Sequence, residues 1–115
     1  MDKKTISKAA LYYTLILIIL SLIPVPDLGL PKFKLFELDK LVHFCTYLIF
    51  TIIWGLNSHS KIKILIFSIL FGLGLEILQH ILPFGRCFDW GDFIANSLGV
   101  LFGTIILFYL KKKLL

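Results

Sequence analysis

The sequence predicts an all-α fold: an integral membrane bundle of four transmembrane helices, in one domain covering residues 1–115. Of these residues, 58% are hydrophobic and only 17% are charged, which is far from the balance of a water-soluble domain. The mean hydropathy of +0.93 indicates the same. Backbone polar groups in hydrocarbon must be hydrogen-bonded within their own segment, so the long apolar runs are expected to be helices rather than open strands.

Four apolar runs are separated by polar or proline-containing segments, and they cover residues 9–23, 41–56, 62–82 and 93–110. A helix needs roughly 17 to 25 residues to cross a bilayer, so the first two runs are slightly short and their ends are expected to reach the interface. The first run follows lysines, as a signal peptide would. No small-residue cleavage site comes after it and Pro24 ends it, so we interpret it as an uncleaved first helix.

Positive charge is distributed unequally between the two sides of the predicted bundle. Four crossings put both termini and the connection between the second and third helices on one side. That side holds eight lysines, namely Lys3, Lys4, Lys8, Lys61, Lys63, Lys111, Lys112 and Lys113. The other side holds Lys32, Lys34, Lys40 and Arg86. Because cytoplasmic loops carry an excess of Lys and Arg, we predict a multi-pass cell-membrane protein with both termini in the cytoplasm.

The formal net charge of +5 would also suit a nucleic-acid partner. The lysines, however, stand at the ends of apolar runs and not on one polar face, so the lipid bilayer is the expected partner and nucleic acid is not. The acidic residues gather on the outer side instead, as Asp27, Glu37, Asp39, Asp89 and Asp92. The sequence leaves the oligomeric state open.

Three stripes of polar residues converge on the outer leaflet. The second helix carries Asp39, His43 and Tyr47 at steps of four residues, which places them on one face. The third helix carries, near its outer end, Glu76, Gln79 and His80. The fourth helix carries, at steps of three or four, Asp89, Asp92, Asn96, Gly99 and Gly103. A hydropathy pattern alone does not require this convergence, so we predict a functional site at the outer end.

Glu76 is the most informative of these residues. It lies six residues before Leu82, which is about 9 Å below the outer end of the helix at 1.5 Å per residue. A charge in the membrane interior costs at least roughly 2.5 kcal/mol, so the carboxyl group should face the bundle interior and either have partners or be neutral. Ionisable groups at such depth favour a functional role over a structural one. The candidate partners are Gln79, His43, Tyr47, Asn96 and Arg86.

Each stripe also has a purely structural interpretation. Asp89 and Asp92 fit the N-cap and the N3 acid of the fourth helix. Gly99 and Gly103 have the spacing of small residues at a helix-packing face, which we favour over a ligand contact. Lys40, at the start of a helix, suits a contact with a lipid headgroup.

The histidines and cysteines form no recognisable metal or redox motif. His43 and His80, with the carboxylates, are metal-type ligands, but HExxH and other paired spacings are absent, so no metal and no cofactor are expected. Cys45 and Cys87 lack CxxC spacing and lie towards the same membrane face, which leaves open whether they pair. A nucleophile elbow, a P-loop and a dinucleotide fingerprint are also absent.

Motifs in the last three helices resemble the VanZ-like family of bacterial membrane proteins. The second helix opens on DKLVHF, the third ends with E-x-x-Q, and the fourth begins with R-x-x-D-x-x-D-x-x-x-N-x-x-G, from about Leu38 to Gly103 in all. The signature residues implied by this resemblance are Asp39, Lys40, His43, Glu76, Gln79, Arg86, Asp89, Asp92, Asn96 and Gly99. The founding member is associated with glycopeptide (teicoplanin) resistance, so the resemblance implies a role in the cell envelope and no particular reaction.

The first functional hypothesis is an outward-facing polar pocket that binds or modifies an envelope component, such as a lipid-linked precursor or a lipid headgroup. Whether the protein is an enzyme is left open. The candidate catalytic residues are Glu76, His43 and Asp89, with Glu76 or His43 as general acid/base. The candidate binding residues are Asp39, Lys40, Gln79, Arg86, Asp92 and Asn96, with Arg86 for an anionic group. The alternative is a non-enzymatic accessory subunit or stability factor for another membrane protein, in which these residues hold the helices together.

Overall fold

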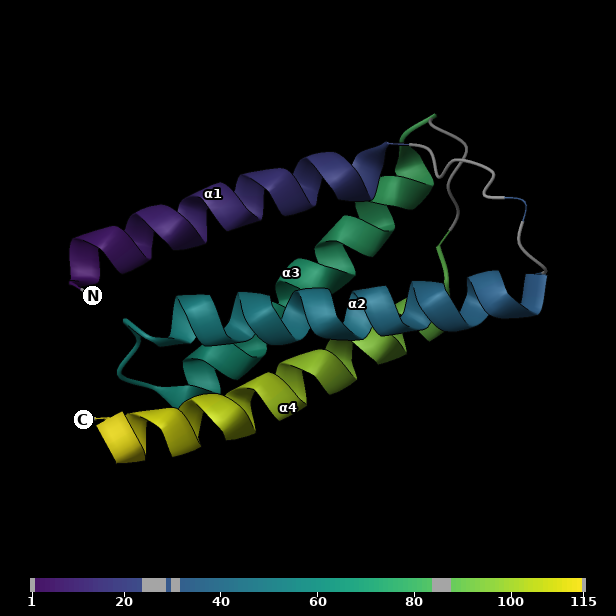
Figure 1. Ribbon diagram of the computed structural model, residues 1–115. Coiled ribbons are helices and arrows are strands. Elements are labelled where there is room, and N and C mark those ends of the chain that lie inside the picture. Colours follow the sequence, from purple (N-terminus) through teal and green to yellow (C-terminus); the bar gives the residue numbers. More distant parts are fainter. Residues whose placement is uncertain (1, 24–28, 30–31, 84–87, 115) are drawn as a thin grey trace.

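The protein is a bundle of four long helices. The computed structural model describes residues 2–23, 29, 32–83 and 88–114. The helices are α1 (Lys3–Leu22), α2 (Lys32–Gly55), α3 (Lys61–Ile81) and α4 (Trp90–Leu114), shown in Figure 1. All four are long and apolar enough to cross a membrane, and the described residues contain no strand. The predicted all-α membrane bundle is therefore confirmed.

The helices run alternately between the two ends of the bundle. Both termini lie at one end, together with the connection between α2 and α3 (Figure 1). We call this the terminal end. At the opposite end, which we call the polar end, α1 and α3 finish and α2 and α4 begin. The long axis of the bundle measures 45 Å, close to the thickness of a bilayer with its headgroup regions.

Helices α1, α2 and α4 are longer than the apolar runs from which they were predicted, whereas α3 differs from its run by one residue at each end. α1 begins at Lys3 and not at residue 9, because Asp2 caps it by accepting a hydrogen bond of 2.8 Å from the Thr5 amide. α2 begins at Lys32 and not at residue 41, so residues 32–40, which precede the predicted run, are helical as well. Hydropathy marks only the part of a helix that lies in hydrocarbon. Lysine, leucine and glutamate are good helix formers, so the helix continues into the interface.

α2 packs most extensively against α4, and two glycines permit this close approach. A Cβ atom added at Gly99 would overlap the carbonyl oxygen of Phe44, and one added at Gly103 would lie 2.8 Å from the carbonyl oxygen of Leu48. The helix-packing interpretation of these two glycines is therefore confirmed. Because α2 and α4 both begin at the polar end, this contact places the first turn of α4 beside Lys40 of α2.

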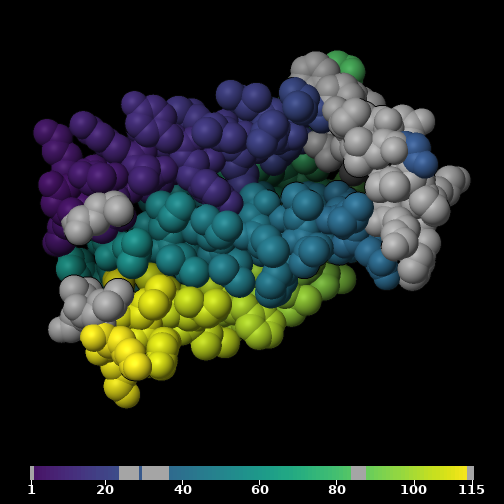
Figure 2. All heavy atoms as spheres, in the orientation of Figure 1, coloured from purple at the N-terminus to yellow at the C-terminus, as the bar shows by residue number. Residues whose placement is uncertain are grey.

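The interior of the bundle is aromatic, and its outer surface is apolar as well. Phe50 of α2 is fully buried and stacks on Phe71 of α3, with ring centroids 4.6 Å apart. On the outside, large apolar side chains such as Ile66 and Phe102 are half exposed. In Figure 2, α2 lies between α1 and α4 on the visible face. Half-exposed apolar side chains on every helix are the surface that a lipid environment requires.

The glycine packing leads to a test with a matched control. Gly99→Ala is expected to destabilise the folded protein by about 1–3 kcal/mol, because even one methyl group meets the α2 backbone. Gly74→Ala on α3 is the control, since a Cβ there meets nothing within 4 Å and alanine favours a helix. Thermal unfolding in detergent compares the two variants. Equal stability of both would contradict the packing described here.

Candidate functional site

An ion cluster at the polar end is centred on Lys40 of α2. Its ammonium group donates hydrogen bonds to Asp92 Oδ1 at 2.5 Å, to Asp89 Oδ2 at 3.0 Å and to Asp39 Oδ2 at 3.3 Å. The Lys40 side chain is only 18% exposed. Instead of the predicted headgroup contact, Lys40 thus joins carboxylates of two helices that are distant in the sequence. Charge-assisted bonds of this kind are stronger than neutral ones.

Asp89 has a second function as the N-cap of α4. Its Oδ1 atom accepts a 2.8 Å hydrogen bond from the Gly91 amide, and its carbonyl oxygen accepts the first helical bond, from Phe93. This bears out the capping interpretation of Asp89. Partial burial raises the pKa of the Asp89 carboxyl group, but the bonds from Lys40 and Gly91 outweigh burial and hold this pKa below its ordinary value.

Gly91 is a residue of the cluster that the sequence analysis missed. A Cβ atom at this position would lie 2.8 Å from Lys40 Cε and 3.1 Å from Asp89 Oδ1. A side chain here would displace the lysine from its carboxylates. The signal in the sequence is a glycine between two acidic residues in the first turn of a helix, where glycine has a low helix propensity.

His43 extends the cluster one turn deeper into the bundle. Its Nδ1 atom lies 2.9 Å from Asn96 Oδ1, and its Nε2 atom lies 3.4 Å from Asp39 Oδ1 and 3.5 Å from Asp92 Oδ2. Both ring nitrogens therefore face oxygen acceptors. A neutral ring donates to one side only, whereas an imidazolium donates to both. This arrangement orients the ring and suits it to carry a proton.

Glu76 approaches the cluster from α3 and is buried, with 1% of its surface exposed. It lies one turn from Gly72 on the same face of α3. A Cβ atom added at Gly72 would be 3.1 Å from Tyr47 Cε1 and 3.5 Å from Asn96 Cβ. This face therefore points towards α2 and α4, and the charges of Asp92 and His43 act on the carboxyl group. Among the described residues, its Oε2 atom has no hydrogen-bond partner. A buried carboxylate oxygen without a donor is unusual and indicates a role beyond packing.

Three predicted residues lie apart from the cluster or outside the described part of the chain. Gln79 is buried and donates a 2.6 Å hydrogen bond to the Ser21 carbonyl oxygen, so it connects α3 to α1. His80 is exposed and accepts a weak bond from the Phe88 amide. Arg86 lies outside the described residues. Cys87 also lies outside the described residues, and so does its possible pairing with Cys45.

The cluster also contains a group of ligands that could hold a metal ion. Asp39, His43 and Asp92 each offer one ligand atom, and these atoms lie within 4.8 Å of one another. Carboxylate and imidazole ligands suit several divalent metals. The ammonium group of Lys40 already supplies a positive charge 2.5 Å from Asp92, and a metal ion would compete with it. Short-range sequence motifs do not reveal this group, because its ligands come from two helices that are distant in the sequence.

The sequence model of the VanZ/LLP1 family matches residues 3–111, which includes almost all of the four helices. No curated protein and no solved structure shows a significant match to the chain.

The lowered pKa of Asp89 leads to a prediction of pH dependence. A carboxyl group with a lowered native pKa stabilises the fold above its ordinary pKa, and this stability is lost as pH falls through the native pKa. Asp89→Asn keeps a capping side chain and removes the charge. At pH 7 the variant should be less stable by about 0.2–1 kcal/mol, because the Asp89 side chain is about half exposed and solvent screens its ion pair. The unfolding temperatures of the two proteins should converge as the pH falls below about 4. A difference that persists unchanged at pH 3 would contradict the ionic role.

Proposed function

The chain belongs to the VanZ/LLP1 family, and from this premise we propose that its polar-end cluster binds a polar group of an envelope component. A lipid-linked precursor or a lipid headgroup is the ligand class. The carboxylate of Glu76 carries the proposal, because it is buried, faces the cluster and keeps one oxygen without a donor. A buried unpaired acceptor costs about 1–3 kcal/mol, and a bound ligand with a donor would recover it.

The charges of the cluster support a ligand that donates hydrogen bonds. Among the described residues it combines four carboxyl groups with only two groups that carry positive charge, Lys40 and His43. Acceptors therefore outnumber donors. Sugar hydroxyl groups and ammonium groups are donors found in lipid-linked precursors and lipid headgroups, and both would suit this excess of acceptors.

We propose in addition that the polar end faces the outside of the cell membrane. Eight lysines belong to the terminal end, in the first turns of α1 and α3 and the last turn of α4. The positive-inside rule then assigns that end to the cytoplasm. An outward-facing cluster would have access to envelope precursors, and through them the protein would affect glycopeptide (teicoplanin) susceptibility.

An enzymatic version of this function uses the same residues. Glu76 or His43 would act as general acid/base, since both lie where a donor group of the ligand would be held. Asp89 and Asp92 would orient the substrate, and Arg86 would contact an anionic group. Asp89 would do so while capping α4.

A second candidate function is a non-enzymatic accessory subunit or stability factor. The observation that favours it is the bonding of Lys40, whose three carboxylate partners connect α2 to the start of α4. In this reading the cluster serves only to hold the helices together for a partner membrane protein.

A conservative change at Glu76 separates the two functions. Glu76→Gln keeps the shape of the side chain and removes its charge. Folded yield, measured by fluorescence-detected chromatography, should stay near that of the natural protein. The amount of lipid or envelope molecule that copurifies should fall about tenfold, because a charge-assisted hydrogen bond is worth about 1.5–3 kcal/mol.

Ser68→Ala is the matched control for this experiment. Ser68 is also buried on α3 with an unpartnered oxygen, but it lies eight residues, or about 12 Å, before Glu76. This control should leave the copurifying molecule unchanged. If Glu76→Gln lowers folded yield as much as Gly103→Leu, and glycopeptide susceptibility follows protein abundance in all variants, the accessory function replaces the proposed one.

A further inference from the structure

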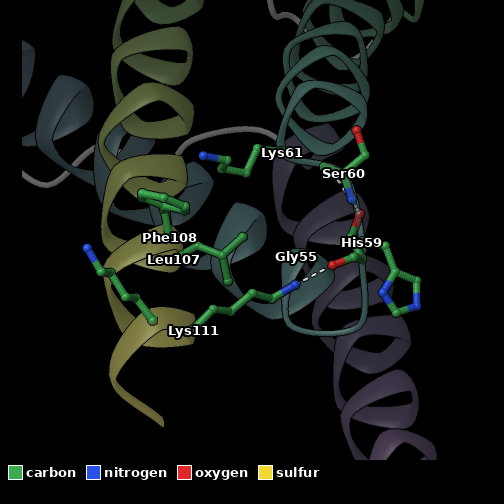
Figure 3. A pocket seen from close by; sticks show the side chains of 9 residues that line it. Gly55, His59, Ser60, Lys61, Leu107, Phe108 and Lys111 are labelled. Carbon is green, nitrogen blue, oxygen red and sulfur yellow. Dashed lines mark hydrogen bonds between the residues drawn. The ribbon is translucent and has the colours of Figure 1, made fainter. Parts of the chain in front are cut away.

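A hollow of about 370 Å³ opens at the terminal end, far from the ion cluster. It lies between the end of α2, the start of α3 and the last turns of α4. Its lining consists of Gly55, Ser58, His59, Ser60, Lys61, Leu107, Phe108, Lys111 and Lys112. Figure 3 shows Leu107 and Phe108 between Lys61 and Lys111, with the His59 ring turned away. The hollow therefore has an apolar wall flanked by positive charges.

Among the described residues, no carboxylate neutralises the cations of this hollow. Lys61 Nζ lies 3.3 Å from the centre of the Phe108 ring, and Lys111 donates a hydrogen bond to the Ser58 carbonyl oxygen. None of the residues that line the hollow is acidic. In the part of the chain that the structure describes, every ion pair between side chains lies at the polar end. The three ammonium groups of this concave site thus have no carboxylate partner among the described residues.

The position of the hollow indicates where an anion would come from. Lys61 begins α3, and Lys111 and Lys112 belong to the last turn of α4, so the site lies at the membrane surface. Leu107 and Phe108 stand one turn closer to the middle of the bilayer. A phospholipid whose phosphate group lies at the lysines would therefore place its acyl chains beside these apolar side chains. Free phosphate has no acyl chains and would make no such contact.

We propose that this hollow binds the phosphate group of an anionic phospholipid from the leaflet at the terminal end. Basic pockets between transmembrane helices bind anionic headgroups through this combination of charge and depth. The ammonium groups of Lys61 and Lys111 would bind the phosphate oxygens. The Ser60 hydroxyl group, which accepts a bond from the Lys63 amide, would donate its own proton to a further phosphate oxygen. This site is independent of the proposed function at the other end of the bundle.

Native mass spectrometry of the full chain in lipid-free detergent tests the proposal. The probes are phosphatidylglycerol, which has a net negative charge, and phosphatidylcholine, which has none. We expect phosphatidylglycerol to bind about tenfold more tightly. The double variant Lys111→Gln with Lys112→Gln should weaken this binding by roughly tenfold or more, since each basic residue contributes about fivefold. The binding of phosphatidylcholine should change little.

Lys4→Gln with Lys8→Gln is the matched control, because these exposed lysines lie at the same end but outside the hollow. It removes the same charge and should change binding less than twofold. An equal loss of phosphatidylglycerol binding in both double variants would show that only the general surface charge matters. That result would overturn the proposed site. So would displacement of the lipid by millimolar inorganic phosphate, which would identify a free-phosphate site instead.

A single variant guards against a loss of folding. Lys111→Gln also removes the bond to Ser58, so the double variant could unfold. Lys61→Gln removes a cation from another helix, and the ammonium group lost in this variant contacts the Phe108 ring rather than a hydrogen-bond acceptor among the described residues. Full retention of phosphatidylglycerol by a folded Lys61→Gln protein would overturn the proposal, whereas a loss of about fivefold supports it.

Discussion

Charged side chains are expensive anywhere between the two surfaces of a bilayer, and this constraint organises the whole molecule. Among the described residues, four carboxyl groups gather with Lys40 and His43 at the polar end, and lysines without an ion-pair partner gather at the terminal end. The helices between them are long and largely apolar. The two ends can differ so strongly because α2 and α4 run in the same direction, and close packing at Gly99 brings the first turn of α4 beside Lys40. Packing in the middle of the membrane thus sets the geometry of the cluster at its surface.

Much of this arrangement follows from local patterns in the sequence. Hydropathy finds the four helices, because a membrane-spanning segment must be apolar over its whole length. Helical periodicity correctly predicts that the faces of His43, Asn96 and Glu76 turn towards one another, since a lipid-facing carboxyl group would be costly. The capping role of Asp89 and the packing role of Gly99 are equally local, because each depends on spacing within one helix.

The remaining features depend on the register between helices, which no single stretch of sequence contains. Lys40 meets Asp92, a partner 52 residues away, and so becomes the centre of the cluster rather than a headgroup contact. Gln79, predicted to bind a ligand, instead reaches a backbone carbonyl group of α1. The hollow at Lys61 and Lys111 likewise forms only when α3 and α4 meet. Hydropathy also does not locate the ends of the helices. Outside the hydrocarbon, capping and helix propensity determine where a helix begins and ends.

The sidedness of the bundle is the most direct test of this account, because the proposed envelope ligand requires the cluster to face outward and the distribution of lysines predicts that it does. Reporter fusions after Trp54 and after Leu110 lie at the terminal end, and a fusion after Ile23 lies at the polar end. A fluorescent protein that folds only in the cytoplasm should be bright in the first two fusions, and a phosphatase active only outside should work in the third. An active phosphatase after Leu110 would place the ion cluster in the cytoplasm and contradict an envelope ligand.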